Sequence, residues 1–303
     1  DFKFLINKKI GIFCNQTAVN RNDNHILDLI GKNPNIFIKA IFEPEHGIWG
    51  MDDKRAKLIG NQRVDPVSGA KVFNLLERSL YPPNWILKDL DLIVVDIQDT
   101  GARYTTFIAS ISKLFESASK HKIPIIILDR PNPLGGVIIE GPIPRPNYQS
   151  LEAYHLLPIR HGMTMGEILL MVNEMGWAKD LKRVNLSIIP IVNWDRSNYL
   201  DDTKLPWKKP IPYIYDMNSL LMYSGMDLLR GTNINVGFGT DSPYLVFGAP
   251  WLATTFFKEK LDMLKLPGLS FEEIEYRPRG SIFNNRIPKY NGEACSGIKI
   301  IVN

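Results

Sequence analysis

Residues 92–104, LIVVDIQDTGARY, decide the fold because a buried strand runs directly into a polar cluster. The four apolar residues at 92–95 are typical of a parallel strand that is covered on both faces. Asp96, Gln98, Asp99 and Arg103 follow within eight positions of that run. Ligands of open α/β sheets bind outside the carboxyl ends of the strands. The stretch therefore predicts a polar site at the edge of a parallel sheet.

Two further apolar runs, at 36–42 and 125–128, end in polar clusters of the same kind. Apolar residues recur at helical spacing between 104 and 120, so this segment predicts the helical crossover that a parallel pair requires. The sequence thus indicates a Rossmann-like α/β layer. The polar residues that follow the two runs are Glu45, His46, Asp129, Arg130 and Asn132.

We expect an α/β protein with a Rossmann-like parallel sheet domain at 1–150 and a smaller α/β subdomain at 151–303. The segment at 131–146 is rich in Pro and Gly and is expected to close the first domain. A cleft between the two parts is the expected place for a small-molecule site. The elements predicted beyond residue 150 are helices at 164–175, 219–229 and 253–266, strands at 186–191 and 298–302, and a glycine-punctuated loop at 231–251. Thr164 is a plausible N-cap of the first of these helices, with Glu167 completing a capping box.

Composition argues against a nucleic-acid-binding or membrane-spanning protein. The 303 residues are 45% hydrophobic with a formal net charge of +4, and no basic stripe interleaved with aromatic residues occurs. We therefore expect no nucleic-acid partner. No apolar run is long enough for a membrane span, and the pattern of a signal peptide is missing. Cys14 and Cys295 lack metal-ligand spacing and are expected to be reduced. Composition indicates neither the compartment nor the oligomeric state.

The residue types suit acid and base chemistry. Glu45, partly shielded by Phe42 and Trp49, is a candidate general acid, and two carboxylates across a pocket are the minimum for glycoside hydrolysis. Asp96 or Asp99 would activate water, serve as nucleophile or stabilise positive charge. Several of these residues also have a structural interpretation. The structural alternatives are an internal ion pair for Arg130, a hydrogen-bonded core position for His161 and the helix cap for Glu167.

Other enzyme classes are less well supported. Residues 14–17 after the first strand read CNQT, where a dinucleotide-binding enzyme needs GxGxxG. The GxSxG motif of serine hydrolases is missing. Glu45, His46, Asp96, Asp99 and His161 could serve a metal-dependent hydrolase, but no pair has the spacing of a strong metal motif. We expect no cofactor and no metal.

Longer motifs resemble those of the exo-β-N-acetylmuramidases of the NamZ type. They are NQT (15–17), PEHG (44–47), DIQDTGARY (96–104), DRPNPLGG (129–136), PIRHGMT (158–164), GTN (231–233) and GAPW (248–251). The resemblance implies a glycosidase that removes a terminal N-acetylmuramic acid from peptidoglycan fragments, with its site in the cleft between two subdomains. It favours a periplasmic or secreted protein and leaves a cytoplasmic one open. Members usually continue past the point where this sequence ends, so a C-terminal portion is expected to be missing.

The resemblance places the catalytic glutamate on Glu45, with Asp96, Asp99 and His161 as further catalytic candidates. Arg103, Arg130 or Arg160 would hold the lactyl carboxylate of muramic acid. The substrate-binding candidates are His46, Gln98, Arg103, Tyr104, Asp129, Arg130, Asn132, Arg160, Arg230 and Asn233.

The second half departs from the family pattern at charged positions. Arg230 and Val236 replace glutamates, and Phe238 and Ser242 replace arginines, while residues 210–213 read PIPY in place of PSPN. Such losses remove hydrogen-bonding groups from one wall of a site and can change its discrimination. We therefore expect a divergent member with altered subsite specificity. A catalytically silent binder of cell-wall sugars is the competing hypothesis, and a metal-dependent hydrolase is the third.

Overall fold

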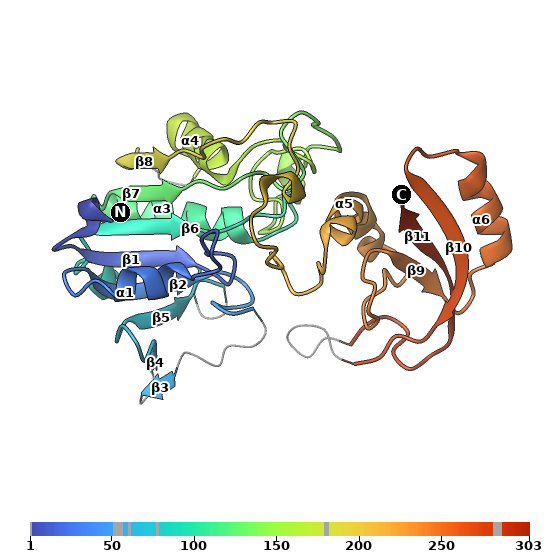
Figure 1. Cartoon of the computed structure of the whole chain (residues 1–303), viewed down its shortest axis with the longest axis horizontal. Helices are drawn as coiled ribbons and strands as arrows, with labels where there is room; N and C mark the ends of the chain where they lie inside the picture. The colour runs from blue at the N-terminus through green and yellow to red at the C-terminus, as the bar shows by residue number, and fades with distance from the viewer. Residues whose placement is uncertain (1, 51–56, 60–61, 77–78, 179–181, 281–286) are drawn as a thin grey trace. The chain divides into compact units, whose positions relative to one another are not determined.

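The computed structural model describes residues 2–50, 57–59, 62–76, 79–178, 182–280 and 287–303. The chain divides into two compact units, Asp1–Ile211 and Pro212–Asn303. Figure 1 labels their elements, and each unit is described here by itself. No helix in the described ranges combines the length and apolar character needed to cross a membrane. Cys14 and Cys295 are buried and form no disulfide in the described part of the chain.

The first unit is built on an eight-stranded sheet with the order β3-β4-β5-β2-β1-β6-β7-β8. The strands from β5 to β8 in this order are parallel, whereas β3 and β4 pair antiparallel at one edge. This arrangement confirms the predicted Rossmann-like α/β layer. The strands are β1 (Lys9–Cys14), β2 (Phe37–Glu43), β3 (Lys57–Ile59), β4 (Gln62–Val64), β5 (Lys71–Asn74), β6 (Leu92–Asp96), β7 (Ile125–Leu128) and β8 (Leu186–Ile189).

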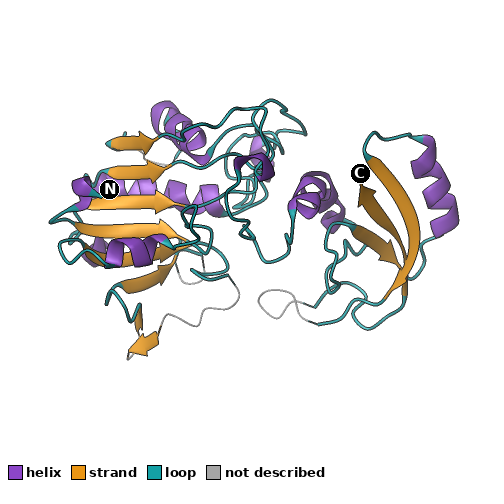
Figure 2. Cartoon of the chain, in the orientation of Figure 1, coloured by secondary structure: helices purple, strands orange, loops and turns teal. Residues whose placement is uncertain are grey.

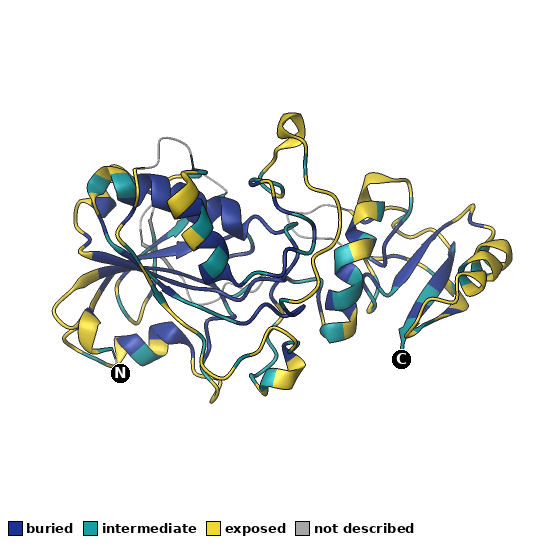
Figure 3. Cartoon of the chain, turned by 90° about the horizontal axis from the view of Figure 1, so that it is seen from above, coloured by how far each residue is buried: buried dark blue, intermediate teal, exposed yellow. Residues whose placement is uncertain are grey.

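Helices cover both faces of this sheet. Figures 1 and 2 show α1 on the near face and α3 behind the strands. Every residue of α3 from Phe107 to Ala118 is buried, so the predicted crossover helix lies against the core. Figure 3 shows the buried residues gathered in the strands and in the helices packed on them. The helices of this unit are α1 (Ile26–Gly31), α2 (Asn84–Leu87), α3 (Phe107–His121) and α4 (Met165–Met175), with 3-10 turns at Lys3–Leu5, Pro146–Tyr148 and Asp201–Thr203.

The first unit extends beyond the predicted boundary at residue 150. β8 pairs in parallel with β7 over four residues, so α4 and β8 form one more crossover of the same sheet. The Pro- and Gly-rich segment at 131–146 is therefore a loop inside the unit. The division lies between Ile211 and Pro212, and it corrects the predicted domains at 1–150 and 151–303.

The second unit contains a three-stranded antiparallel sheet with the order β10-β11-β9. Its core includes Phe247, Phe271, Ile298 and Ile300. The predicted helices at 219–229 and 253–266 and the strand at 298–302 correspond to elements of this unit, whereas β9 and β10 were not predicted. The elements are α5 (Met217–Met226), a 3-10 turn (Asp227–Gly231), β9 (Val246–Ala249), α6 (Thr254–Met263), β10 (Leu269–Tyr276) and β11 (Cys295–Val302).

The N-terminus of α4 is anchored to the end of β7. Thr164 and Glu167 form the predicted capping box. The Thr164 hydroxyl also donates to Asp129 Oδ2 at 2.7 Å, and the Gly166 N–H donates to Asp129 Oδ1 at 2.8 Å. A β-carbon on Gly166 would lie 2.7 Å from the Asp129 carboxyl carbon, so glycine permits this close approach. One hydroxyl thus caps the helix and joins it to the sheet.

Replacing Thr164 by Ala is expected to lower the free energy of unfolding by about 1–2 kcal/mol, because both hydrogen bonds of the hydroxyl are lost. The Thr164→Ser variant keeps the hydroxyl and is expected to stay within about 0.5 kcal/mol of the original protein. Urea unfolding of the three proteins measures the difference. A serine variant as unstable as the alanine variant would contradict this role of the hydroxyl.

Candidate active site

The polar clusters that follow β1, β2, β6 and β7 share one edge of the sheet because these strands are parallel. Hydrogen bonds connect the loops directly. The Gln98 N–H donates to Thr17 Oγ1 at 2.8 Å, and Gln98 Nε2 donates to the Pro131 carbonyl at 2.8 Å. The Gln98 side chain therefore joins the loop after β6 to the loop after β7, a structural role for a predicted binding residue.

Arg130 and Asp96 form an ion pair at this edge. Arg130 Nε lies 2.5 Å from Asp96 Oδ1, and Arg130 Nη2 donates to the Val19 carbonyl at 3.0 Å. Asp96 is only 4% exposed, so its charge is balanced within the protein. The internal ion pair considered for Arg130 is thus the arrangement in the structure, and it links the loops after β1, β6 and β7.

Asp99 and His161 also lie together, both buried. Asp99 accepts hydrogen bonds from Thr105 Oγ1 at 2.9 Å and from the Gly101 N–H at 3.1 Å. His161 Nε2 lies 3.4 Å from Asp99 Oδ2, while its Nδ1 accepts from the Met163 N–H at 3.2 Å. A neutral ring that accepts at Nδ1 carries its proton on Nε2, facing Asp99. The pair joins the loop after β6 to the segment before α4.

Glu45 is carried on a turn whose base is a buried glutamate. Glu43, the last residue of β2, is 0% exposed and forms an ion pair with Arg63. Its Oε2 accepts from the Ile48 N–H at 3.2 Å, and Asn74 Nδ2 donates to the Pro44 carbonyl at 3.3 Å. These contacts hold both ends of the turn. Sequence reasoning missed Glu43, although a carboxylate that ends a buried apolar run was the available signal.

The Glu45 side chain is half-buried at the start of α3. Its Oε2 accepts a hydrogen bond from Thr106 Oγ1 at 3.0 Å, and Thr106 is the N-cap residue of that helix. A hydroxyl at the start of α3 therefore orients the carboxylate. This arrangement suits a group that must exchange a proton with a ligand.

His46, the neighbour of Glu45, adopts an unusual backbone conformation. Its φ is +74°, in the left-handed region, and its side chain is 9% exposed. Burial lowers the pKa of His46 to about 4. The imidazole is therefore neutral at neutral pH and adds no charge beside Glu45.

The remaining predicted binding residues of the first unit mostly hold loops. Arg103 Nη1 donates to the Leu157 carbonyl, and Arg160 Nη2 donates to the Leu134 carbonyl. Asn132 Nδ2 donates to the Met163 carbonyl at 2.9 Å, and its Oδ1 accepts from the Leu134 N–H. Burial raises the pKa of Asp129, which anchors α4. Tyr104, the neighbour of Arg103, is half-buried in the loop after β6.

In the second unit, two of the divergent positions contact each other. The Arg230 guanidinium lies 5.8 Å from the Phe238 ring and forms an ion pair with Asp227 at 3.2 Å. Tyr244 donates from its hydroxyl to Asp227 Oδ1 at 2.9 Å. Burial raises the pKa of Asp227. The carbonyl of Asn233 accepts from the Tyr290 hydroxyl at 2.6 Å, on a segment exposed to solvent.

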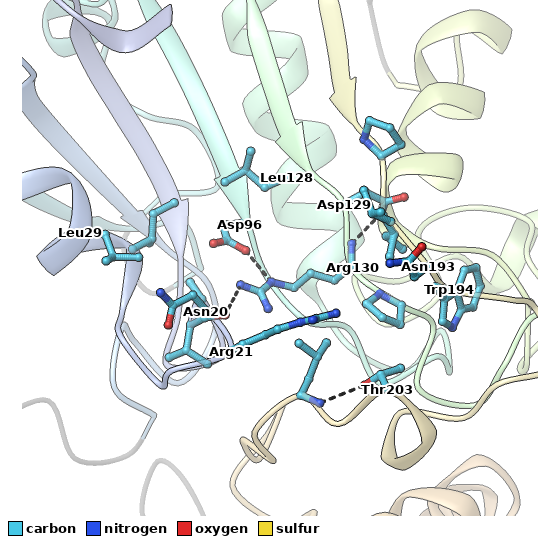
Figure 4. A pocket seen from close by; sticks show the side chains of 18 of the residues that line it. Asn20, Arg21, Leu29, Asp96, Leu128, Asp129, Arg130, Asn193, Trp194 and Thr203 are labelled. Atoms are coloured by element: carbon cyan, nitrogen blue, oxygen red, sulfur yellow. Dashed lines mark hydrogen bonds and ion pairs between the residues drawn. The ribbon is translucent and has the colours of Figure 1, made fainter. Parts of the chain in front are cut away.

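A cavity of about 580 Å³ opens within the first unit at the carboxyl edge of the sheet (Figure 4). It contains Asp96, Asp129 and Arg130 of the predicted set, whereas Glu45 is not part of its lining. Sequence reasoning did not identify five further lining residues with polar side chains, because only the folded chain brings their loops together. These residues are Asn20, Arg21, Asn193, Trp194 and Thr203. Among the described residues, no group of three metal-ligating side chains could hold an ion.

Two family models together match almost the whole chain. The N-terminal model of the exo-β-N-acetylmuramidase NamZ matches residues 10–218, and the C-terminal model matches residues 221–303. The chain belongs to the NamZ family. This result confirms the resemblance seen in the motifs, and the two NamZ models meet close to the boundary between the two units.

Individual relatives agree with this assignment. The chain is 35% identical over 300 residues to the peptidoglycan β-N-acetylmuramidase NamZ of Bacillus subtilis (strain 168), covering 99% of this chain and 69% of that protein. Crystal structures of two DUF1343 family proteins of Bacteroides fragilis NCTC 9343 are also similar. One has a TM-score of 0.86 and 31% identity, covering 100% of this chain and 74% of that one. The other has a TM-score of 0.78 and 29% identity, covering 98% and 73%.

The buried His46 generates a prediction about pH. The pKa is about 4 in the folded protein and about 6.5 in the unfolded chain, so the unfolded chain binds more protons between these values. The contribution of neutral His46 to the free energy of unfolding is therefore fully present above pH 6.5. It is lost as the pH falls toward 4, at up to about 1.4 kcal/mol per pH unit. His155, whose pKa burial also lowers to about 4, adds a parallel loss.

The His46→Asn variant tests this prediction because Asn tolerates the left-handed backbone and does not titrate. We expect its unfolding free energy to fall roughly half as steeply between pH 6.5 and 4.5 as in the original protein. Urea unfolding at a series of pH values measures the two slopes. Equal slopes would show that His46 does not titrate as its burial requires.

Proposed function

We propose that this protein is an exo-acting glycosidase that removes terminal β-linked N-acetylmuramic acid from peptidoglycan fragments. The observation that carries the proposal is the state of Glu45. This carboxylate stands on a braced turn at the ligand-binding edge and accepts a hydrogen bond from Thr106. The neighbouring carboxylates of Glu43, Asp96 and Asp99 serve internal ion pairs and hydrogen bonds. Membership in the NamZ family supports the same reaction.

In this mechanism Glu45 donates its proton to the glycosidic oxygen as the bond from that oxygen to the sugar C1 breaks. Positive charge then develops on the sugar ring, as in other glycosidases. Asp99, facing His161, lies at the same edge and contributes negative potential there, whereas Arg130 balances the charge of Asp96. After departure of the leaving sugar, water adds to C1 and returns a proton to Glu45, which restores the enzyme.

Three routes complete the reaction. Asp96 or Asp99 activates the water that attacks C1, or Asp96 stabilises the charged ring until water adds. In the third route the substrate's own acetamido oxygen bonds to C1 as the glycosidic bond breaks, and water then displaces that oxygen from C1. The contacts favour the third route, because Asp96 accepts from Arg130 and both Asp99 oxygens accept from the protein. Acetamido participation retains the configuration at C1, whereas a single displacement by water inverts it. Proton NMR of the first sugar released separates these outcomes, and inversion would exclude the acetamido route.

Replacing Glu45 by Gln is expected to lower kcat on a β-N-acetylmuramyl disaccharide by about 10²–10⁴-fold, because the general acid is lost. A chromogenic aryl β-N-acetylmuramide has a better leaving group and is expected to lose less. The matched control is Glu152→Gln, which changes an exposed glutamate outside the site. An unchanged rate on the disaccharide would overturn the role of Glu45.

The same assay separates the competing functions. A silent sugar-binding protein would bind N-acetylmuramic acid and release no sugar before or after the substitution. A metal-dependent hydrolase would lose its activity in a chelator, whereas a Glu45-dependent glycosidase keeps it.

A further inference from the structure

The cavity lies where the strand order of the sheet reverses. β1 is flanked by β2 on one side and by β6 on the other, so the chain builds the sheet outward through β2 and then returns across β1. Ligands of doubly wound sheets bind in the crevice at this switch point. The loop after β1 supplies Asn20 and Arg21 to the cavity lining, and the end of β6 supplies Asp96. Its volume of about 580 Å³ is in the range of small-molecule sites.

The acidic groups in the lining are already engaged by the protein. Asp96 Oδ1 accepts from Arg130, and Asp129 accepts from Thr164, from Gly166 N–H and from Arg130 N–H. These contacts occupy most of the carboxylate oxygens, so the cavity offers a ligand few hydrogen-bond acceptors.

Several hydrogen-bond donors of the lining, in contrast, have no acceptor among the described residues. Trp194 Nε1 is buried and has no hydrogen-bond partner among the described residues. None of those residues forms an ion pair with Arg21. The second terminal nitrogen of Arg130, Nη1, likewise has no acceptor in the described part of the chain. A surplus of charged and neutral donors fits an acceptor-rich anion.

The other walls of the cavity are apolar, with Leu29, Leu128 and Val192 among the lining residues. The site therefore fits a carboxylate joined to a short aliphatic group. The lactyl ether of N-acetylmuramic acid has this composition, since its carboxylate is attached to a carbon that bears a methyl group.

We propose that this switch-point cavity binds the lactyl carboxylate of N-acetylmuramic acid, with Arg21 and Arg130 as charged donors and Trp194 as a neutral one. The inference rests on the proposed function for the identity of the sugar. Of the three arginines first considered for this carboxylate, Arg130 is part of the cavity lining, whereas Arg103 and Arg160 are not. The cavity thus distinguishes muramic acid from glucosamine, which lacks the lactyl group.

Isothermal titration calorimetry with three ligands tests the proposal without turnover. The ligands are N-acetylmuramic acid, N-acetylglucosamine and free lactate. We expect the protein to bind N-acetylmuramic acid at least tenfold more tightly than N-acetylglucosamine. Arg21→Ala should remove about tenfold of the affinity for N-acetylmuramic acid and leave N-acetylglucosamine unchanged, since one charged hydrogen-bond partner is lost.

Trp194→Phe keeps an aromatic ring and removes only the N–H, so we expect a loss of about threefold to tenfold for N-acetylmuramic acid alone. Arg183→Ala is the matched control, because this exposed arginine pairs with Glu174 and is not part of the cavity lining. It should bind all three ligands as the original protein does.

Unchanged discrimination in both cavity variants would overturn the inference, even where the Glu45→Gln result supports the muramidase. The opposite combination, in which Arg21 governs binding but Glu45→Gln leaves cleavage intact, would reject the proposed function and keep the cavity. Lactate that binds as tightly as N-acetylmuramic acid would show a site for free carboxylates, and would overturn the assignment to the sugar.

Discussion

The ion pair between Arg130 and Asp96 is the contact on which the ligand-binding edge depends. A single guanidinium reaches the end of β6 through Asp96 and the loop after β1 through the Val19 carbonyl. Removing one member of a buried ion pair leaves a charge without compensation, at a cost of about 3–5 kcal/mol. Three strand ends are therefore fixed relative to each other by one side chain, and the cavity beside them takes its shape from that constraint.

The carboxylates around this pair have two different roles, one structural and one proposed to be catalytic. Glu43, Asp99 and Asp129 each accept several hydrogen bonds, and they hold turns, loops and the start of α4. Glu45 projects from a turn that Glu43 stabilises, and Thr106 orients it. A rigid base beneath the carboxylate is what general acid catalysis requires, since the proton donor must be positioned before the ligand arrives.

Local patterns in the sequence predicted the elements that depend on local interactions. The runs at 92–95 and 125–128 form β6 and β7, and the capping box at Thr164 begins α4. β10 escaped prediction because half of its residues, LSFEEIEY, are exposed and three of them are glutamates. The boundary at residue 150 failed for a nonlocal reason, since the pairing of β8 with β7 is decided by the sheet as a whole.

The candidate site was predictable in its location and only partly in its roles. Sequence position identifies Arg103, Arg130 and Arg160 equally well as donors, and only the folded chain shows that Arg130 lines the cavity. Arg21 and Trp194 lie more than 170 positions apart, so their shared cavity has no signature along the chain. The position of Glu45, in contrast, has a local signature in the sequence, because the turn that carries it directly follows β2.

In the second unit, Arg230 and Tyr244 both contact the buried carboxylate of Asp227, and Phe238 packs against both of them. Asp227 is 8% exposed and needs compensation, which Arg230 supplies from the next turn with the Tyr244 hydroxyl. Tyr244 has a φ of +65°, a strained conformation for a bulky residue, and its ring packs 5.4 Å from Phe238. Arg230 and Phe238 are thus parts of one cluster, in which a cation and an aromatic ring stabilise a buried acid. Because Arg230 and Phe238 are both engaged in this cluster, the charge of Asp227 is compensated within the second unit itself.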